Sequence, residues 1–556
     1  MRALIDAAYL WREHDPDPVT RAELTTVIDA AQTGDAAAAA ELSARFSGPL
    51  TFGTAGLRGP VGAGESRMNI AVVIRATAGL ARYLLDTVGP SATVVVGCDG
   101  RRGSSEFMAA ALQVLSGAGL TAVALPERLP TPVTAYAVRA LDCEAGIMIT
   151  ASHNPPADNG FKVYLGGAAS DPAGRGVQIV APADSEIAAR IAACPPADAV
   201  PRSTATITPA PAWLPAGYIA RMAGHRDSAA ESPVTVVLTA MHGVGGATAL
   251  AVLAAAGITR VHPVPEQFDP DPRFPTVAFP NPEEPGALDR ALALARRTQA
   301  DVVIALDPDA DRCSVAVPGP RGRWQQLTGD ELGALLGEQA AADPTRPGDT
   351  LACSIVSSRL LMAIAEHHGL TGVQTLTGFK WIARTPGLRF GYEEAIGYCT
   401  DPQAVADKDG IGTAVQVITL IETLAAHGKT LLDQLDELAR RHGLYASAQL
   451  SFRVADPAAL SDGMARLRGA LPVQLAGSPV VEYRDLADGY RGLPPTDGLL
   501  VRTAADDRVI VRPSGTEPKL KCYLECVLPV GQTIPRAAAG ERLEMIKTEL
   551  TAALGW

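Results

Sequence analysis

Three aspartates at alternate positions follow a short apolar run and could together hold a metal ion. Asp307, Asp309 and Asp311 come directly after the run VVIAL, which is typical of a buried strand. Carboxylates at this spacing, at the end of a strand, can converge on one cation that prefers oxygen ligands. The EF-hand alternative fails, because its loop would need glycine where Arg312 stands and glutamate where Pro318 stands. The sequence therefore predicts a metal site at a strand end, where α/β proteins usually bind ligands.

Two other aspartate-rich segments have similar letters but a different context. HDPDP at 14–18 and FDPDP at 268–272 have no buried strand leading into them and no third aspartate. We expect both to be solvated turns.

Ser152 is a candidate nucleophile in a second strand-end loop, TASHNPP, which follows the apolar run AGIMIT. A serine in such a turn can act as a nucleophile once a charge or a metal activates it. The loop is not the G-x-S-x-G elbow of hydrolases, since Asn154 stands at the second glycine position, and no hydrolase triad can be assigned from the sequence. His153 either assists proton transfer or holds the loop. By itself a segment of this kind is more often just a turn rich in Asn and Pro.

Two further segments have the composition of anion-binding loops. RPSGTEPK joins two expected strands and combines the guanidinium of Arg512 with the hydroxyls of Ser514 and Thr516 around Gly515. Such a loop can offer N–H groups, hydroxyls and a fork of donors to a phosphate. FGTAGLRG, which contains Arg58, has the same character near the N-terminus, and its glycines permit close backbone approach.

The elements that must position these loops follow a βα pattern. Apolar runs at 93–100, 145–150, 233–239, 300–307 and 351–357 alternate with helical stretches rich in Ala and Leu, a pattern typical of parallel α/β layers. In the last hundred residues, apolar and polar residues instead alternate along the chain. They predict strands at 451–460, 498–515 and 519–528, and a closing helix over 536–553, as in an antiparallel α+β domain.

Length and pauses in the pattern indicate several domains. A chain of 556 residues exceeds the size of one core, so three to five domains are expected. Pauses near 212–216 and 318–323 give four predicted domains. They are 1–215 with the serine loop, 216–320 with the aspartate loop, 321–446 with an acidic loop, and 447–556 with the phosphate loop.

Composition excludes several classes of partner. A net charge of −12 argues against a nucleic-acid surface, and the sequence has no run of about 18 apolar residues that would span a membrane. The eight cysteines form no C-x-x-C pair, so neither a disulfide framework nor a zinc site is expected. A reducing cytoplasm is the expected location.

Taken together, the motifs resemble those of a known family. The order is a glycine-rich arginine loop, the serine loop, the aspartate loop, the acidic loop GYEEAIG and the phosphate loop. This order, over about residues 45–526, resembles the α-D-phosphohexomutase superfamily, which includes phosphoglucomutases and phosphomannomutases. The resemblance implies three consecutive α/β domains and a C-terminal TBP-like α+β domain around a central cleft.

The resemblance also implies roles for particular residues. Ser152 would carry a phosphate, and Asp307, Asp309 and Asp311 would hold Mg²⁺ with a phosphoserine oxygen as a further ligand. Glu393 would bind sugar hydroxyls. The loop of the non-transferring phosphate and the basic residues of the cleft would be Arg512, Ser514, Gly515, Thr516, Arg58, Lys162, Arg312 and Lys380.

The implied activity is an intramolecular phosphotransfer between hexose 1-phosphate and hexose 6-phosphate, with glucose favoured over mannose and a sugar 1,6-bisphosphate as activator. One departure from the pattern is Ala395, where many members carry serine. That version resembles the branch with phosphopentomutases and glucose-1,6-bisphosphate synthases, so both activities stay open. A metal-dependent sugar phosphatase and a non-catalytic phosphosugar-binding protein are the other classes. We expect a monomer or dimer that binds a phosphosugar, and neither nucleic acid nor membrane.

Overall fold

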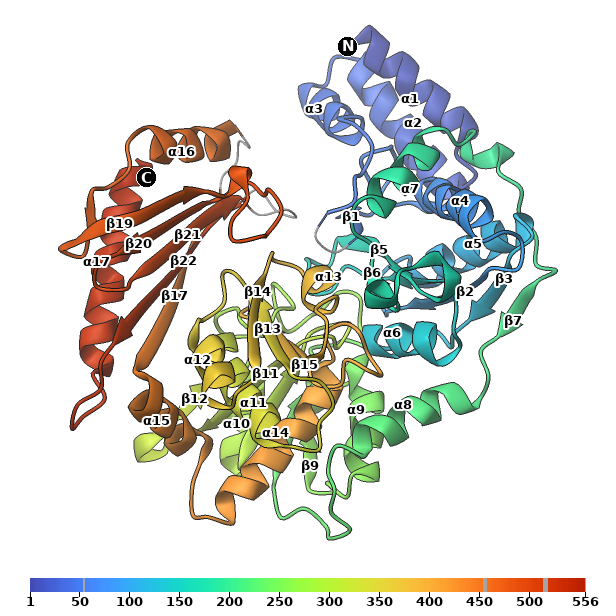
Figure 1. Cartoon of the computed structure of the whole chain (residues 1–556). Coiled ribbons are helices and arrows are strands. Elements are labelled where there is room, and N and C mark those ends of the chain that lie inside the picture. Colours follow the sequence, from blue (N-terminus) through green and yellow to red (C-terminus); the bar gives the residue numbers. More distant parts are fainter. Residues whose placement is uncertain (54–55, 454–457, 514–518, 556) are drawn as a thin grey trace. The chain divides into compact units, whose positions relative to one another are not determined.

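The computed structural model describes residues 1–53, 56–453, 458–513 and 519–555 (Figure 1). The chain divides into two compact units. Unit 1 consists of Met1–Gln326 and Gly397–Thr419, and unit 2 of Leu327–Ile396 and Leu420–Trp556. None of the described helices combines the length and the apolar character that a membrane span requires.

The first sheet of unit 1 is mixed and carries the serine loop. Its strand order is β1-β5-β4-β2-β3-β7, with β6 beside β5. Strands β2, β3, β4 and β7 run parallel, whereas β1 and β6 pair antiparallel with β5, which itself pairs antiparallel with β4. The strands are β1 (Leu57–Pro60), β2 (Thr93–Cys98), β3 (Thr121–Ala124), β4 (Ala145–Ile149), β5 (Asp158–Leu165), β6 (Val177–Gln178) and β7 (Ile207–Pro209).

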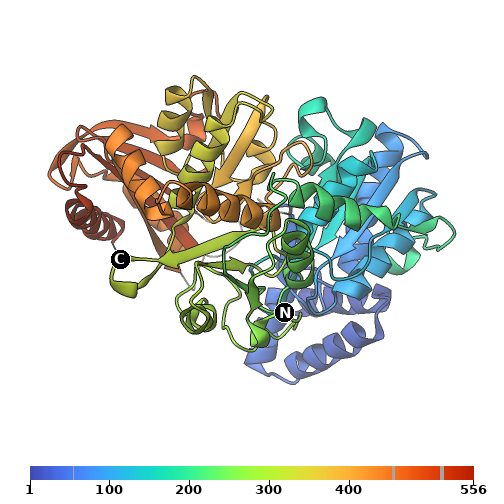
Figure 2. The ribbon, with the colours of Figure 1, turned by 90° about the horizontal axis from the view of Figure 1, so that it is seen from below.

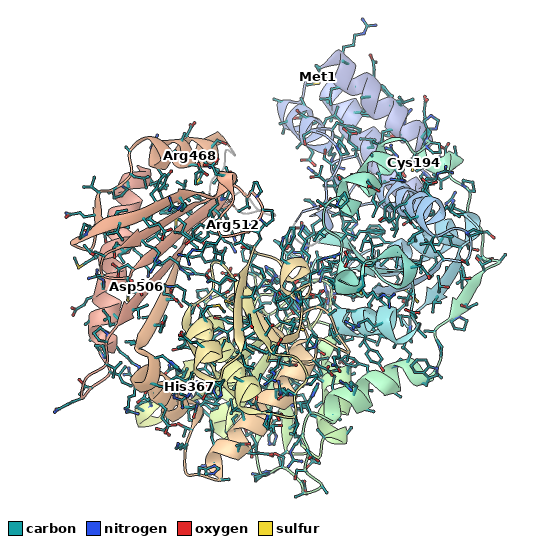
Figure 3. The ribbon with its side chains drawn as sticks, viewed as in Figure 1. Met1, Cys194, His367, Arg468, Asp506 and Arg512 are labelled. Carbon is teal, nitrogen blue, oxygen red and sulfur yellow. The ribbon has the colours of Figure 1, made fainter. Side chains whose placement is uncertain are left out.

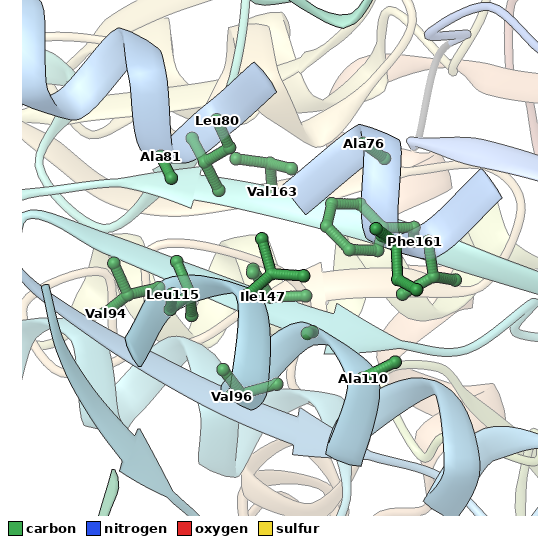
Figure 4. Packing of buried hydrophobic residues seen from close by; sticks show 14 of the residues in the cluster. Ala76, Leu80, Ala81, Val94, Val96, Ala110, Leu115, Ile147, Phe161 and Val163 are labelled. Atoms are coloured by element: carbon green, nitrogen blue, oxygen red, sulfur yellow. The ribbon is translucent and has the colours of Figure 1, made fainter. Parts of the chain in front are cut away.

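Helices cover both faces of this sheet, which is why its central strands read as continuous apolar runs. Helices α4 (Ile70–Thr87) and α5 (Ser104–Gly117) cover one face (Figure 4), and α6 (Thr131–Ala140) packs on the other. Side chains alternate accordingly: Val94 and Val96 of β2 contact the α4–α5 face, and Met148 of β4 contacts Thr134 of α6. Unit 1 also contains α7 (Ala183–Ala192) and α8 (Trp213–Ala223).

Three N-terminal helices precede this sheet and lie side by side (Figure 2): α1 (Arg2–His14), α2 (Pro18–Gln32) and α3 (Ala36–Arg45). Asp17 and Asp35 cap the N-termini of α2 and α3 with their side chains. Leu24, Ile28 and Leu42 form the core of this layer. Asp17 therefore has a structural role in the aspartate-rich segment at 14–18.

The second sheet of unit 1 carries the aspartate loop. Its order is β12-β11-β10-β8-β9, with β8, β9 and β10 parallel and β11 and β12 antiparallel. The elements are β8 (Val236–Thr239), α9 (Gly245–Ala255), β9 (Val261–Pro263), α10 (Asp289–Thr298), β10 (Val302–Leu306), β11 (Cys313–Pro318) and β12 (Trp324–Gln326). The predicted pause at 318–323 is a turn inside this sheet, and the pause at 212–216 is the start of α8. The predicted domain limits themselves stay predictions.

In unit 2, β13 pairs in parallel with β14 and with β15. Thr328 and Glu331 form a reciprocal capping box at the start of α11, and Thr430 and Asp433 form another at the start of α15. The elements of this part are α11 (Gly329–Ala342), β13 (Thr350–Ser354), α12 (Leu360–His367), β14 (Thr371–Thr375), α13 (Phe379–Ile382), β15 (Leu388–Glu393), β16 (Gly397–Cys399), α14 (Gly410–Ala425) and α15 (Leu431–His442), with β16 and residues 410–419 belonging to unit 1.

The C-terminal sheet of unit 2 is antiparallel throughout, in the order β17-β22-β21-β20-β19-β18. Alternate residues such as Val501, Val509 and Leu524 pack on helices, whereas Ile510 and Tyr523 belong to a core on the other face. The elements are β17 (Leu444–Arg453), α16 (Ala458–Gly469), β18 (Gln474–Leu475), β19 (Ser478–Asp485), β20 (Leu499–Thr503), β21 (Arg508–Pro513), β22 (Lys519–Leu528) and α17 (Arg536–Leu554).

These sheets and their covering helices confirm the predicted fold class, which is three consecutive α/β domains followed by a C-terminal α+β domain. One local prediction was wrong: the segment 451–460 is a strand only up to Arg453, and from Ala458 the chain is helical. Alanine and leucine have high helix propensity, so the strand could not extend over that stretch against a following helical run.

Candidate active site

The three aspartates lie together, fully buried, in the loop after β10. Asp307, Asp309 and Asp311 are 0%, 0% and 1% exposed, and one oxygen from each lies within 4.8 Å of the others. The loop is closed by its own backbone: Ala310 has φ 56° and donates its N–H to the Asp307 carbonyl at 2.9 Å. The predicted convergence of the three carboxylates is therefore present.

The triad has the donor set of a hard-cation site. Within the described part of the chain, Oδ1 of Asp309 and Oδ1 of Asp311 have no hydrogen-bond partner although both atoms are buried. A buried carboxylate oxygen left unpaired is costly, and a divalent cation with oxygen ligands would satisfy it. The residues present thus fit a metal of the magnesium type.

Ser152 contacts this triad although it lies 155 positions before Asp307 in the sequence. Its hydroxyl donates to Oδ2 of Asp307 at 2.8 Å, and its Oγ lies 3.2 Å from Nδ1 of His153. The side chain is buried, and the backbone has φ 53°, an uncommon left-handed conformation for a residue other than glycine. Its N–H donates to Oγ1 of Thr150 at 2.9 Å, which fixes the turn.

One buried arginine, Arg101, holds the serine loop from within. Its guanidinium donates to the carbonyls of Ser152, Asn154, Pro155 and Asp158, at 2.5, 2.7, 2.8 and 3.1 Å. This residue is not among those predicted from the sequence. It lies in DGRRG directly after β2, and no local pattern distinguishes its side chain from that of the exposed arginine beside it.

Lys162, on β5, is fully buried against the triad. Its ammonium donates to Oδ2 of Asp309 at 2.8 Å and to Oδ2 of Asp311 at 2.9 Å. Thr131, at the start of α6, donates to the same oxygen of Asp309 at 2.6 Å. The structure therefore places Lys162 at the aspartates, on oxygens other than the two unpaired ones.

A second lysine, Lys408, also reaches the triad and was missed from the sequence. Its Nζ lies 3.2 Å from Oδ2 of Asp311 and 3.3 Å from Oδ1 of Asp407. The hydroxyl of Tyr164 and the amide of Gln178 donate to the other oxygen of Asp407, at 2.7 and 2.8 Å. The run ADKDG before α14 resembles a solvated turn, so only the tertiary contact identifies this lysine.

The charges around the triad decide its ionisation. Burial opposes the charged form of Asp311, but Lys162, Lys408 and Arg312 outweigh burial and hold its pKa below the ordinary value. Burial, with Asp309 and Asp311, raises the pKa of Asp307 well above the ordinary value. Although burial alone would lower it, Asp309 and Asp311 raise the pKa of Lys162. Asp307, the aspartate that Ser152 contacts, is therefore the one of the three whose charged form is least favoured.

Two predicted arginines lie beside this group. Nε of Arg312 is 3.7 Å from Oδ1 of Asp311 and 4.0 Å from Oδ2 of Asp307. Arg58, on β1, donates to Oδ1 of Asn154 at 3.2 Å, which ties the glycine-rich segment to the serine loop. Unit 1 therefore brings together the serine, the triad and both arginines.

The predicted sugar-binding residues lie in unit 2. Glu393 ends β15, and its Oε1 accepts the N–H of Gly378 at 2.6 Å, two residues before Lys380 on α13. Glu394 beside it turns inward and accepts the hydroxyls of Ser354 and Ser357, at 3.1 and 3.0 Å. Ala395 follows in the same loop.

Arg512 lies on β21 in unit 2 (Figure 3). Burial and Glu394 raise the pKa of the Tyr523 hydroxyl well above its ordinary value, and a hydrogen bond with Arg512 opposes that rise. Glu393 acts on the same tyrosine. Arg512 and the two glutamates thus share one neighbourhood. Three other predicted positions of the phosphate loop lie outside the described residues: Ser514, Gly515 and Thr516.

Comparison with known families gives a match to all four domains of one family, in order. The models of phosphoglucomutase/phosphomannomutase alpha/beta/alpha domains I, II and III match residues 49–193, 216–320 and 328–442, and that of the C-terminal domain matches 451–530.

Several known proteins are similar over most of the chain. A probable phosphomannomutase of Haemophilus influenzae is 44% identical over 463 residues, which cover 82% of this chain and 93% of that protein. A phosphopentomutase of Mus musculus is 34% identical over 96% of this chain and 92% of its own length. A glucose 1,6-bisphosphate synthase of Homo sapiens is 32% identical over 93% and 89%.

Solved structures show the same fold. A phosphoglucomutase/phosphomannomutase family protein from Burkholderia thailandensis superposes with a TM-score of 0.68 at 21% identity, over 90% of this chain and 97% of its own. The open form of the phosphoglucomutase pp63/parafusin from Paramecium also gives 0.68, at 16% identity, over 91% and 96%.

Proposed function

The chain belongs to the phosphoglucomutase/phosphomannomutase family, an isomerase of the phosphotransferase type, and we propose that Ser152 carries the phosphoryl group in transit between two positions of a hexose phosphate. The observation that supports this role is the 2.8 Å hydrogen bond from Ser152 to Asp307, inside a buried carboxylate triad. A phosphoserine at this point would transfer its phosphoryl group to a free sugar hydroxyl. The freed Ser152 hydroxyl would then accept the other phosphoryl group of the resulting bisphosphate.

The residues of unit 1 suit that transfer. A divalent cation on the triad supplies neutralisation of phosphoryl oxygen charge, and Mg²⁺ is the ion we propose. Lys162, Lys408 and Arg312 add three positive charges around the triad, where a low-dielectric setting strengthens each of them. His153, with Nδ1 beside Oγ, can hold or move the proton of the serine.

We propose that unit 2 supplies the sugar and the distal phosphate contacts. Glu393 would accept sugar hydroxyls, and Lys380, Arg512 and the segment of Ser514 to Thr516 would hold the phosphate that is not transferred. Ala395 provides no hydroxyl in that acidic loop, so the loop places one fewer polar constraint on the sugar.

Two sugar classes have support. The 44% identical relative is named a probable phosphomannomutase, which makes mannose a candidate equal to the glucose that the motifs favour. The phosphopentomutase of Mus musculus covers 96% of this chain, and Ala395 is consistent with a smaller sugar, so a pentose phosphate is the second candidate. Side-by-side kcat/KM for glucose, mannose and ribose 1-phosphates, with the bisphosphate activator present, decides between them.

The carrier role has a direct test. Purified protein should show about 80 Da of added mass on Ser152, the mass of one phosphoryl group. Ser152→Ala should lose both this mass and mutase turnover by a factor of at least about 10⁴. Ser185→Ala, at an exposed serine of α7, is the control and should keep both. Full activity of Ser152→Ala would exclude the carrier role.

The metal role is tested by binding rather than by turnover. Asp309→Asn should weaken Mg²⁺ binding measured by calorimetry at least about tenfold, because it replaces a charged ligand by a neutral one. Asp269→Asn, in the exposed FDPDP segment, should bind Mg²⁺ like the wild type. Equal affinities for both variants would place the ion elsewhere.

A further inference from the structure

A second cavity of unit 1 borders the serine loop, and Arg101 is the one residue described above for the candidate active site that lines it. Its volume is about 660 Å³. Four arginines line it, Arg101, Arg102, Arg128 and Arg273, together with Ser105 at the start of α5. In a chain of net charge −12, four arginines around one cavity are a marked local concentration of positive charge.

The position of the cavity follows from the topology of the first sheet. The chain leaves β2 toward β3 on one side of the sheet, and it leaves β4 toward β5 on the other side. The carboxyl ends of β2 and β4 therefore border a topological switch point, where open α/β sheets form a ligand-binding crevice. The loop after β2 and Pro156 and Ala157 of the serine loop both line the cavity.

Two of the arginines are not neutralised by an ion pair with a described carboxylate. Within the described residues no ion pair joins Arg102 or Arg128 to a carboxylate, and both side chains are exposed. Arg273, by contrast, is held by a two-pronged pair with Asp271. The guanidinium is a donor fork that matches a phosphate geometrically.

The nearby carboxylates are mostly committed to other partners. Asp99 is buried and accepts the hydroxyl of Ser104 at 2.6 Å and the N–H of Arg101 at 2.9 Å. Glu127 accepts the hydroxyl of Ser105 at 2.7 Å. Asp99 also pairs with Nε of Arg101 at 3.4 Å, and Glu106 is the other carboxylate in the described lining. With Arg273 paired to Asp271, Arg102 and Arg128 are the arginines of this lining without an ion pair to any described residue.

The wall of the cavity is connected to the catalytic serine. Arg101 lines the cavity and donates four hydrogen bonds to carbonyls of the serine loop, including that of Ser152. The Nη donors of Arg101 are all engaged and its side chain is 1% exposed, so an anion in the cavity would act on those four bonds through its charge rather than through a shared donor.

We propose that this cavity is an effector site for a small phosphate-bearing molecule, separate from the sugar site, and that its occupancy acts on the serine loop through Arg101. Arg102 and Arg128 provide the recognition of the phosphate. Arg101 transmits the effect. The binding step is independent of the proposed mutase function.

The test uses inorganic phosphate as the probe and the full chain. Calorimetric titration of the wild type should show one more phosphate site than titration of the variant Arg102→Gln/Arg128→Gln, or a site weakened at least tenfold in the variant. The control is Arg296→Gln/Arg297→Gln, which removes two exposed charges of α10 and should bind phosphate like the wild type. Equal binding by all three proteins would overturn the proposal.

Coupling to the serine loop has its own measurement. Phosphate should change hydrogen–deuterium exchange of the amides at 150–158 in the wild type and in the control, but not in the double variant. Arg128 has φ 60°, so Arg128→Asn is a second variant whose residue tolerates this backbone. It should reproduce the loss of the exchange response. An unchanged response in both variants would show that phosphate acts from another site, and turnover enters neither measurement.

Discussion

Ser152 and Arg101 show how one residue can be constrained for chemistry. A left-handed backbone costs a residue with a side chain about 1–3 kcal/mol, and Ser152 adopts it at φ 53°. The four carbonyl contacts of Arg101 and the hydroxyl of Thr150 stabilise this turn. In return the hydroxyl of Ser152 points at Asp307 rather than at solvent.

Asp330, on α11, is a half-buried carboxyl that forms no ion pair with any cation among the described residues. Its Oδ1 accepts the N–H of Ser358 at 2.7 Å and the hydroxyl of Tyr392 at 2.9 Å, and its Oδ2 accepts the hydroxyl of Ser447 at 2.6 Å. Burial nevertheless dominates and raises the pKa of Asp330 from 3.8 to about 6. The folded state therefore favours the neutral carboxyl.

This pKa predicts a pH dependence of stability. Because the folded pKa is above the unfolded one, the stabilising contribution is complete below about pH 4 and is lost as the pH rises to about 6, a change of about 3 kcal/mol. Asp330→Asn should remove this dependence, since its amide cannot ionise and can still donate to Ser447. The difference in Tm between wild type and Asp330→Asn should thus fall between pH 4 and 6. A constant difference would contradict this account of the Asp330 carboxyl.

At the scale of elements, the two functional loops share one arrangement. The serine loop follows β4 and the aspartate loop follows β10, and each strand has a parallel neighbour whose chain departs to the opposite side. For the second sheet that neighbour is β8, whose following loop has left-handed backbone at Met241 and His242. The strained loop packs directly on the aspartate loop, since Val244 donates its N–H to the Pro308 carbonyl at 2.8 Å.

Gly243 in that loop offers a test of the packing. A Cβ at Gly243 would lie 2.4 Å from the Cα and from the carbonyl oxygen of Pro308, too close for any side chain. Gly243→Ala should displace the aspartate loop and weaken Mn²⁺ binding, read by electron paramagnetic resonance, by about 10–100-fold, as loss of a supporting contact usually does.

The matched control for this substitution is Gly224→Ala. A Cβ at Gly224 would meet only the carbonyls of Ala220 and Arg221, at 3.4 Å, an ordinary contact. Its Mn²⁺ affinity should equal that of the wild type. If Gly243→Ala also bound Mn²⁺ normally, the loop after β8 would have no part in positioning the triad.

At the scale of the molecule, unit 2 joins two sheets of different kinds through buried charge. Arg359, beside α12, donates to Oε2 of Glu525 on β22 at 2.5 Å and to Oδ1 of Asp506 at 2.8 Å. Arg508 donates to the carbonyls of Ile355 and Ser357 at 2.8 and 2.6 Å. Burial opposes the charge of Glu525, but Arg508 and Arg359 outweigh it and lower its pKa.

Removal of one partner should loosen this junction. Arg359→Ala leaves Glu525 buried with only Arg508, at 3.5 Å, and should destabilise unit 2 by about 2–4 kcal/mol. We expect its Tm to fall by about 5–10 °C. Arg440→Ala, which breaks an exposed pair with Asp436, should change Tm by no more than about 1–2 °C. Equal Tm values for the two variants would show that the junction does not depend on Arg359.

The sequence by itself determined the features that depend on local pattern. Apolar runs placed β2, β4, β8, β10 and β13, because strands buried on both faces must be apolar throughout. Spacing alone identified Asp307, Asp309 and Asp311, since residues that share one short loop converge wherever the loop lies. The order of the motifs led to the family.

Only the tertiary structure decided the contacts between distant segments. The partnership of Ser152 with Asp307 spans 155 positions, and the roles of Arg101 and Lys408 depend on carbonyls and carboxylates supplied by other strands. The predicted strands and helices also began at residue 93, whereas the described part of the chain has helices α1 to α4 before that point. The physical reason is the same in each case. The role of a charged side chain and the position of a weakly patterned helix depend on the residues that they pack against, and the fold determines which residues those are.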